Sequence, residues 1–157
     1  MSRILPHYEI NERTMALLPS NNISYETIAM ETDQTLYIEK TPFEIIKRGC
    51  LDNFCSFEGR RESIKYLTGF SRKVPIPISI YRNIFAFPTR ALKDWKCGWI
   101  FYNHVESIVE DVSRYHQTLV IFKNGNQIKM DVTILELLKQ LERTSLIKSL
   151  SSGALRS

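Results

Sequence analysis

The chain has 157 residues, of which 43% are hydrophobic and 24% charged, and its formal net charge is +4. This composition is typical of a globular protein, and the length favours a single compact domain. No apolar run approaches the roughly eighteen residues that cross a bilayer, and the first residues lack the apolar stretch of a signal peptide, so we expect a cytoplasmic protein.

The first forty residues are expected to form β-strands. Residues 14–18 are apolar and end at Pro19, and residues 23–30 and 35–39 flank a polar turn, which predicts a hairpin. This segment is acidic, because residues 1–39 hold two basic side chains against six acidic ones.

A first helix is predicted to begin after Thr41. Thr41 can cap the helix, Pro42 occupies its first position, and Glu44 completes a capping box. Because glycine readily takes the left-handed conformation of a helix end, we expect the helix to stop at Gly49 after about two turns.

A second helix is predicted over residues 57–68, with Ser56 as its cap and Gly69 as its stop. Two of its basic residues lie four positions apart and are therefore neighbours on the helix surface, and a third flanks them. The predicted helix thus has a basic edge that consists of Arg60, Arg61 and Lys65.

The middle of the chain concentrates the positive charge. Residues 73–80 are extended and contain two prolines, which places them at a sheet edge or in a connection. Residues 84–87 are a predicted strand, and residues 90–96 a basic loop. Residues 40–99 hold twelve basic side chains against five acidic ones, a distribution that attracts polyanions. A solvated basic face without a partner is the other explanation.

The last part of the chain combines strands with a third helix. Residues 98–102 resume an extended run, and residues 119–132 form a hairpin around Asn124-Gly125. Helical spacing of apolar residues runs from Ile134 through about Leu146. The fold class is therefore α+β, mostly antiparallel strands with three short-to-medium helices, and we expect one domain over residues 1–148 and a polar, disordered tail over residues 149–157.

Three cysteines and three histidines raise two other kinds of site. Four residues are suitable zinc ligands, and they fall into two pairs along the chain, Cys50 with Cys55 and Cys97 with His104. Neither of these pairs has the close spacing of zinc knuckles. We expect reduced thiols and no cofactor. A cysteine hydrolase built on Cys97 is an alternative, yet the sequence contains no nucleophile elbow, HExxH or phosphate loop, so we predict that the chain is not an enzyme.

Several short strings, taken in order, resemble landmarks of the ComK family. The resemblance spans roughly residues 8–148, and the ordered set is more specific than any one string. The strings are Gly59-Arg60-Arg61, Pro75-Ile76-Pro77-Ile78, Ile84-Phe85-Ala86-Phe87-Pro88-Thr89, Cys97-Gly98-Trp99-Ile100, His104-Val105 and Phe122-Lys123-Asn124-Gly125.

The resemblance implies a bacterial activator of competence genes that binds paired A/T-rich boxes, mainly through the minor groove, as dimers that combine into tetramers. A narrow A-tract minor groove has an enhanced negative potential that attracts arginine and lysine, which agrees with the charge distribution. Apart from Arg60 and Arg61, which lie in a family string, we choose the contacts from charge and placement. The candidate DNA-binding residues are Arg60, Arg61, Lys65, Arg72, Lys73, Arg90, Lys93 and Lys96.

The C-terminus departs from the family pattern. Family members generally continue into a longer tail that docks an adaptor, which delivers them to a protease. This chain stops at Ser157, and its last residues do not resemble that tail, so we expect any adaptor contact to be weakened. The alternative function is a protein-interaction module or a non-activating remnant that uses the apolar helix over residues 134–146 to dimerise or dock.

Overall fold

Seven strands form the larger of two sheets. The computed structural model describes residues 3–113 and 117–156. The strand order is β1-β4-β3-β2-β7-β6-β5, and all neighbours are antiparallel except β1 and β4. The strands are β1 (Ile4–Leu5), β2 (Thr14–Pro19), β3 (Thr27–Glu31), β4 (Thr35–Ile38), β5 (Ile76–Ser79), β6 (Ile84–Pro88) and β7 (Trp99–Phe101).

A smaller antiparallel sheet follows, with β8 (Val105–Glu110), β9 (Thr118–Phe122) and β10 (Gln127–Met130) in the order β10-β9-β8. A 3₁₀ turn, η1 (Tyr102–His104), joins β7 to β8. The expected hairpin between β9 and β10 is confirmed, and Gly125 has the positive φ of 92° that its turn requires. Strand β8 was not among the predicted strands.

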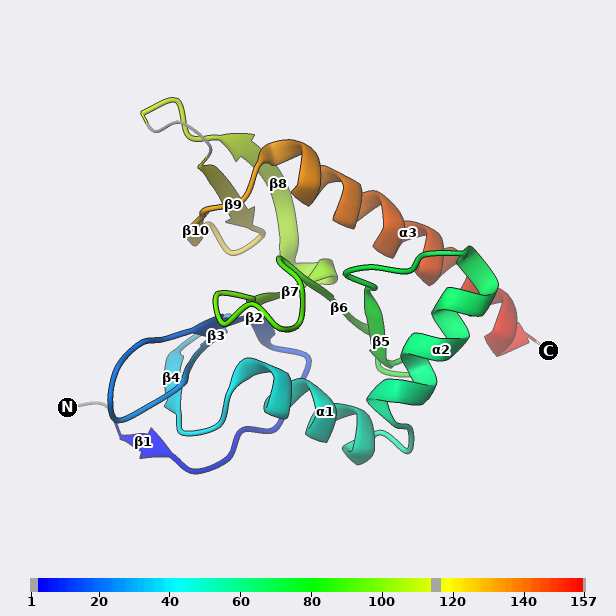
Figure 1. Cartoon of the computed structure of the whole chain (residues 1–157), viewed down its shortest axis with the longest axis horizontal. Coiled ribbons are helices and arrows are strands. Elements are labelled where there is room, and N and C mark those ends of the chain that lie inside the picture. Colours follow the sequence, from blue (N-terminus) through cyan, green and yellow to red (C-terminus); the bar gives the residue numbers. More distant parts are fainter. Residues whose placement is uncertain (1–2, 114–116, 157) are drawn as a thin grey trace.

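Three helices complete the chain: α1 (Pro42–Asp52), α2 (Phe57–Thr68) and α3 (Ile134–Arg156). In Figure 1 the small sheet lies above the large one, α1 lies below it, and α3 runs from the small sheet toward α2. The structure confirms the α+β class and its mostly antiparallel strands. Within the described residues, no helix combines the length and the hydropathy that a membrane span needs.

The large sheet separates two hydrophobic cores, because alternate residues of a strand point to opposite faces. Leu17 and Trp99 face a core that is shared with α1 and α2, whereas Ala16 and Ile100 face a core that is shared with the small sheet. Helix α3 contributes to both cores and therefore links the two sheets. Its buried contacts are Leu137 in the second core and Ile147 in the first.

Helix α1 begins as predicted but ends later. The capping box between Thr41 and Glu44 is present, and Pro42 is the first helical residue. The predicted end at Gly49 is wrong, since α1 continues to Asp52. Gly49 is instead a point of close packing: a Cβ atom there would lie 2.7 Å from Cδ1 of the buried Ile10.

Helix α2 has the predicted ends. Ser56 Oγ accepts a hydrogen bond from the Gly59 N–H at 3.0 Å, and Gly69 closes the helix with a φ of 79°. Phe57 and Ile64 are buried against the sheet, whereas Leu67, near the C-terminal end of the helix, is exposed.

Helix α3 extends beyond the predicted end near Leu146. It continues to Arg156, so the predicted helix end is wrong, and the polar residues expected to form a disordered tail over 149–157 are helical as far as Arg156. Ile147 is buried in the core, and the Ser151 and Ser152 hydroxyls both donate hydrogen bonds to the Lys148 carbonyl. The two hydroxyls are thus satisfied by a carbonyl of the helix itself, while Ile147 anchors the start of the polar segment in the core. The division into a domain and a tail at residue 148 stays a prediction.

Candidate nucleic-acid interface

The basic residues of α2 lie on two sides of its buried stripe. At about 100° per residue, Arg61 and Lys65 fall on one side of the stripe and Arg60 on the other. Arg61 and Lys65 are partly exposed, and no carboxylate of the described residues lies within ion-pairing distance of either. This pair is available to bind an anion.

Part of the Arg60 guanidinium, unlike those of the exposed cations, is buried in the protein. Its Nε atom is buried, with no hydrogen-bond partner among the described residues. It also lies close enough to Cys50 to affect the pKa of that thiol. Removal of Arg60 would therefore disturb packing as well as surface charge.

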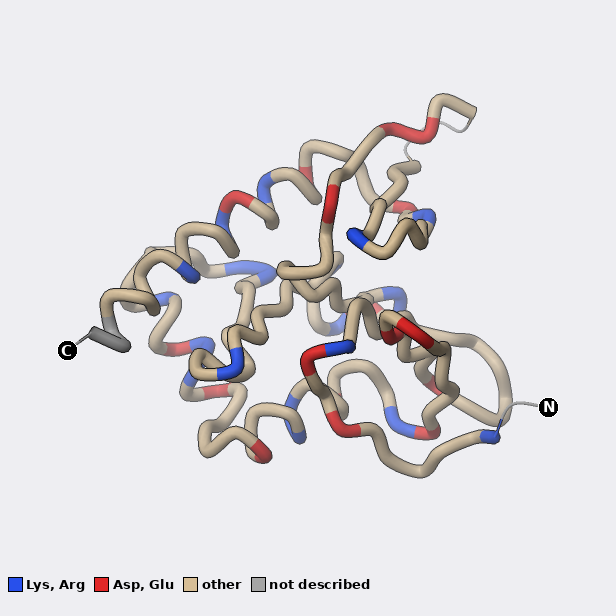
Figure 2. Tube along the Cα trace, turned by 180° about the vertical axis from the view of Figure 1, so that it is seen from behind, with Lys and Arg blue, Asp and Glu red and all other residues tan. Residues whose placement is uncertain are grey.

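The loop after α2 places Arg72 and Lys73 against α3. Lys73 has a φ of 49°, and its carbonyl accepts a hydrogen bond from Gln140 Nε2 at 2.8 Å. Its Nζ atom lies 3.4 Å from Glu136 Oε1, so its charge is partly neutralised. Arg72 is exposed and has no ion pair among the described residues. In Figure 2 the basic positions of this loop lie beside those of α3.

Two basic residues of α3 join this group, and neither was predicted from the sequence. Lys139 and Arg143 line a groove together with Arg72. Their spacing of four residues puts them on one side of the helix, and this spacing was a signal that could have identified them.

The loop over residues 90–96 forms a separate group. Arg90 pairs with Asp94 and with Asp131, each at 3.4 Å, whereas Lys93 and Lys96 are exposed. The loop lies over the large sheet beside the start of α1, away from α2 (Figure 1). Arg61, Lys65, Arg72 and Lys73 thus follow one another along the chain from α2 into the next loop, whereas Lys93 and Lys96 lie in the separate loop beside α1.

Exposed aromatic side chains accompany these cations. Tyr66 on α2 is 87% exposed, and Tyr81 in the turn between β5 and β6 is 92% exposed. Trp95 is 64% exposed, and the Lys96 Nζ atom lies 5.9 Å from the centre of its ring. Phe85 and Phe87, in contrast, are buried in the core. The exposed rings are suited to contact bases or sugars.

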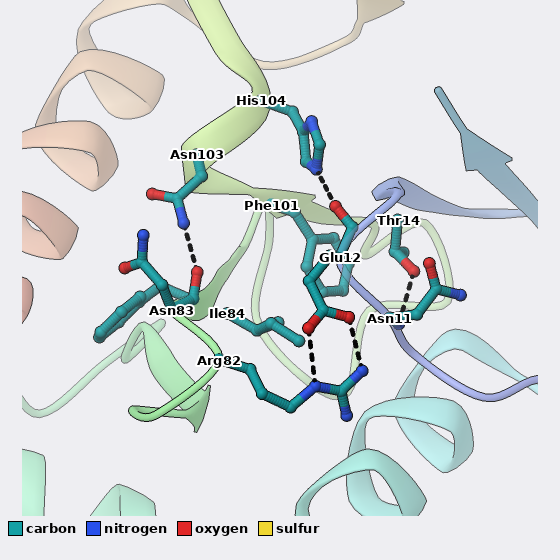
Figure 3. A pocket seen from close by; sticks show the side chains of 10 residues that line it. Asn11, Glu12, Thr14, Arg82, Asn83, Ile84, Phe101, Asn103 and His104 are labelled. Carbon is teal, nitrogen blue, oxygen red and sulfur yellow. Dashed lines mark hydrogen bonds and ion pairs between the residues drawn. The ribbon is translucent and has the colours of Figure 1, made fainter. Parts of the chain in front are cut away.

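A polar pocket between β6, η1 and the segment before β2 holds a strong ion pair (Figure 3). Arg82 donates to both carboxylate oxygens of Glu12, at 3.0 and 2.7 Å. These bonds lower the pKa of Glu12 to about 2. A His104 ring nitrogen lies 2.7 Å from the Glu12 carbonyl oxygen. The Arg82 charge is therefore neutralised by Glu12 within the protein. The contacts in this pocket connect the segment before β2 to the turn before β6 and to η1.

The three thiols are free, and two of them are buried. Cys97 Sγ lies 3.3 Å from the Arg90 carbonyl oxygen, and Cys55 Sγ lies 3.2 Å from the Cys50 carbonyl oxygen. Among residues 3–113 and 117–156, no group of three or more His, Cys, Asp or Glu side chains has the geometry to hold a metal ion.

The buried thiols are expected to resist alkylation. Burial raises the pKa of Cys50 to about 12 and also raises the pKa of Cys97, so at pH 8 the thiolate fraction of Cys50 is on the order of 10⁻⁴. In iodoacetamide at pH 8, mass spectrometry should find both thiols modified far more slowly in the folded protein than in urea. Equal rates at Cys97 in the two states would instead indicate an accessible, reactive thiol.

The comparisons with known proteins agree with one another. A family model described as ComK protein matches residues 5–155. The chain is also 30% identical over 148 residues to the competence transcription factor of Bacillus subtilis (strain 168), an alignment that covers 92% of this chain and 75% of that protein. No solved structure matches the chain significantly.

Proposed function

Because this chain belongs to the ComK family, a family of transcription factors, we propose that it regulates competence genes by binding A/T-rich DNA largely through the minor groove and activating transcription. The proposed contacts are those expected from the sequence. They are Arg60, Arg61, Lys65, Arg72, Lys73, Arg90, Lys93 and Lys96.

One observation carries the proposal: a row of basic side chains runs from α2 into the following loop. Arg61, Lys65 and Arg72 are at least partly exposed and have no carboxylate of the described residues within ion-pairing distance, so no protein carboxylate neutralises their charges. Unpaired cations next to one another attract the phosphates that border a narrow minor groove. Within the proposed set, Lys73 and Arg90 contribute less, because carboxylates partly neutralise them.

We expect the protein to bind an A/T-rich duplex more tightly than a G/C-rich duplex of equal length. Each phosphate contact contributes about 0.9 to the slope of log affinity against log salt, so the slope should reach several units. Fluorescence anisotropy at a series of salt concentrations measures both quantities. Equal affinity for the two duplexes would contradict the A/T preference, and a slope near zero would contradict the phosphate contacts.

A second candidate function is a protein-interaction module. Helix α3 exposes Leu135, Leu138 and Leu146, which are large apolar side chains on an otherwise polar surface. Such side chains are suited to contact a second copy of the chain, and a dimer or tetramer would match paired binding sites. Size-exclusion chromatography with light scattering, with and without A/T-rich DNA, separates the two functions. A pure interaction module would self-associate without shifting the DNA.

A further inference from the structure

A groove of about 680 Å³ lies between the loop after α2 and the middle of α3. Its floor and walls include Phe70 and Leu146, and four charged residues surround it: Arg72, Lys139, Glu142 and Arg143. Three cations therefore face one carboxylate. No carboxylate of the described residues forms an ion pair with any of the three cations.

Arg143 is fixed in position within this groove. Its guanidinium carbon lies 4.2 Å from the centre of the Phe70 ring, and its Nη1 atom donates to Gln140 Oε1 at 3.0 Å and to the Lys73 carbonyl at 3.4 Å. A guanidinium that is stacked on a ring and bonded at one edge loses little further freedom when it binds an anion.

The environment of Arg143 favours a negatively charged ligand. Its Nε atom is buried with no hydrogen-bond partner among the described residues, and burial lowers the pKa of the guanidinium below its ordinary value. A partly buried charge without a counter-ion is destabilising, and an anion in the groove would relieve that cost.

We propose that this groove binds a backbone phosphate of the DNA duplex, held by Arg143 and Lys139 of α3 and by Arg72 of the preceding loop. The inference rests on the proposed function and extends the interface from α2 to α3. A phosphate fits better than a base edge, because one stacked guanidinium and two exposed cations line the same groove. The groove would position the duplex and would not read its sequence.

The test uses the double variant Arg72→Gln/Lys139→Gln. Both side chains are exposed and make no hydrogen bond within the described residues, so we expect the variant to fold normally by circular dichroism. In anisotropy titrations, the salt slope should fall by about one unit, equally for A/T-rich and G/C-rich duplexes. Arg3→Gln/Lys40→Gln is the matched control, since it removes the same net charge near the opposite edge of the sheet and should leave the slope unchanged.

A second variant tests the stacked arginine itself. Arg143→Lys keeps the charge but removes the planar stacking on Phe70, and it should weaken binding to both duplexes several-fold without changing their ratio. Suppose that the wild-type protein binds DNA and that the groove variants have the same affinity and salt slope as the control variant. The groove proposal is then overturned and the proposed function stands. If the wild-type protein does not bind DNA, the proposed function fails first.

Inorganic phosphate separates the two sources of the ligand. If millimolar phosphate raises the Tm of the wild-type protein but not that of the groove variants, while DNA slopes remain equal, the groove binds a free anion and the assignment to DNA is overturned. If the variants lose the phosphate-dependent rise in Tm and also show a smaller salt slope, the duplex assignment is supported, because the same cations then bind free phosphate and the DNA backbone.

Discussion

Replacement of Arg61 and Lys65 together with alanine is expected to weaken binding to an A/T-rich duplex by about tenfold or more at 0.1 M salt, because fewer counter-ions are released from the DNA when two cations are removed. The two residues lie on one side of α2 and are free of ion pairs within the described part of the chain. The magnitude of the salt slope should fall by one to two units, about one for each phosphate that is no longer neutralised. Anisotropy titrations of the double variant measure both effects.

The design avoids Arg60, because its buried Nε atom gives that residue a share in packing. Arg3→Ala/Lys40→Ala removes the same net charge near the opposite edge of the sheet, where β1 and β4 lie. We expect this control to retain most of the wild-type affinity. If the control variant and the α2 variant are weakened equally, total charge explains the binding and α2 does not form the interface.

Gln140→Ala is expected to lower the free energy of unfolding by about 1–3 kcal/mol, because the buried Pro88 carbonyl loses its side-chain donor and the Lys73 carbonyl keeps only its longer bond from Arg143. The Gln140 side chain is buried, and its Nε2 atom donates at 2.8 Å to the carbonyls of both Lys73 and Pro88. It thereby joins α3 to the loop that carries Arg72 and to the end of β6. Urea denaturation followed by circular dichroism measures the change.

Glu142→Ala is the matched control, since that side chain is exposed two positions away on the same helix. Its effect should lie within about 0.5 kcal/mol, as is usual for surface positions. A destabilisation by Gln140→Ala no greater than this would show that the two carbonyls find other partners. The expected destabilisation together with unchanged DNA affinity of the folded variant would confine the role of Gln140 to stability.

Short sequence patterns correctly predicted helix caps and turns whose hydrogen bonds lie within a few residues. The capping box at Thr41, the Gly69 stop and the Gly125 turn each depend on hydrogen bonds inside one segment. The wrong helix ends depend instead on distant contacts. Gly49 remains helical where Ile10 packs against it, and α3 continues because Ile147 reaches the core.

In the candidate site, too, the features set by local sequence could be predicted and those set by distant contacts could not. The basic edge of α2 follows from its helical period, so Arg61 and Lys65 could be placed from sequence. The pairing of Lys73 with Glu136 depends on packing between segments far apart in the chain, as does the stacking of Arg143 on Phe70. Neither interaction has a local pattern, so free cations could not be distinguished from paired ones before the fold was known.

Strand β5 lies at one edge of the large sheet and contains Pro77, with Pro75 just before it. Positions two apart in a strand direct their backbone groups the same way, and proline has no N–H to donate. The strand therefore lacks the N–H of Pro77, and Pro75, the residue just before the strand, has no N–H to donate either. Another extended chain cannot complete a regular ladder there, which protects the edge from strand addition and fibril growth.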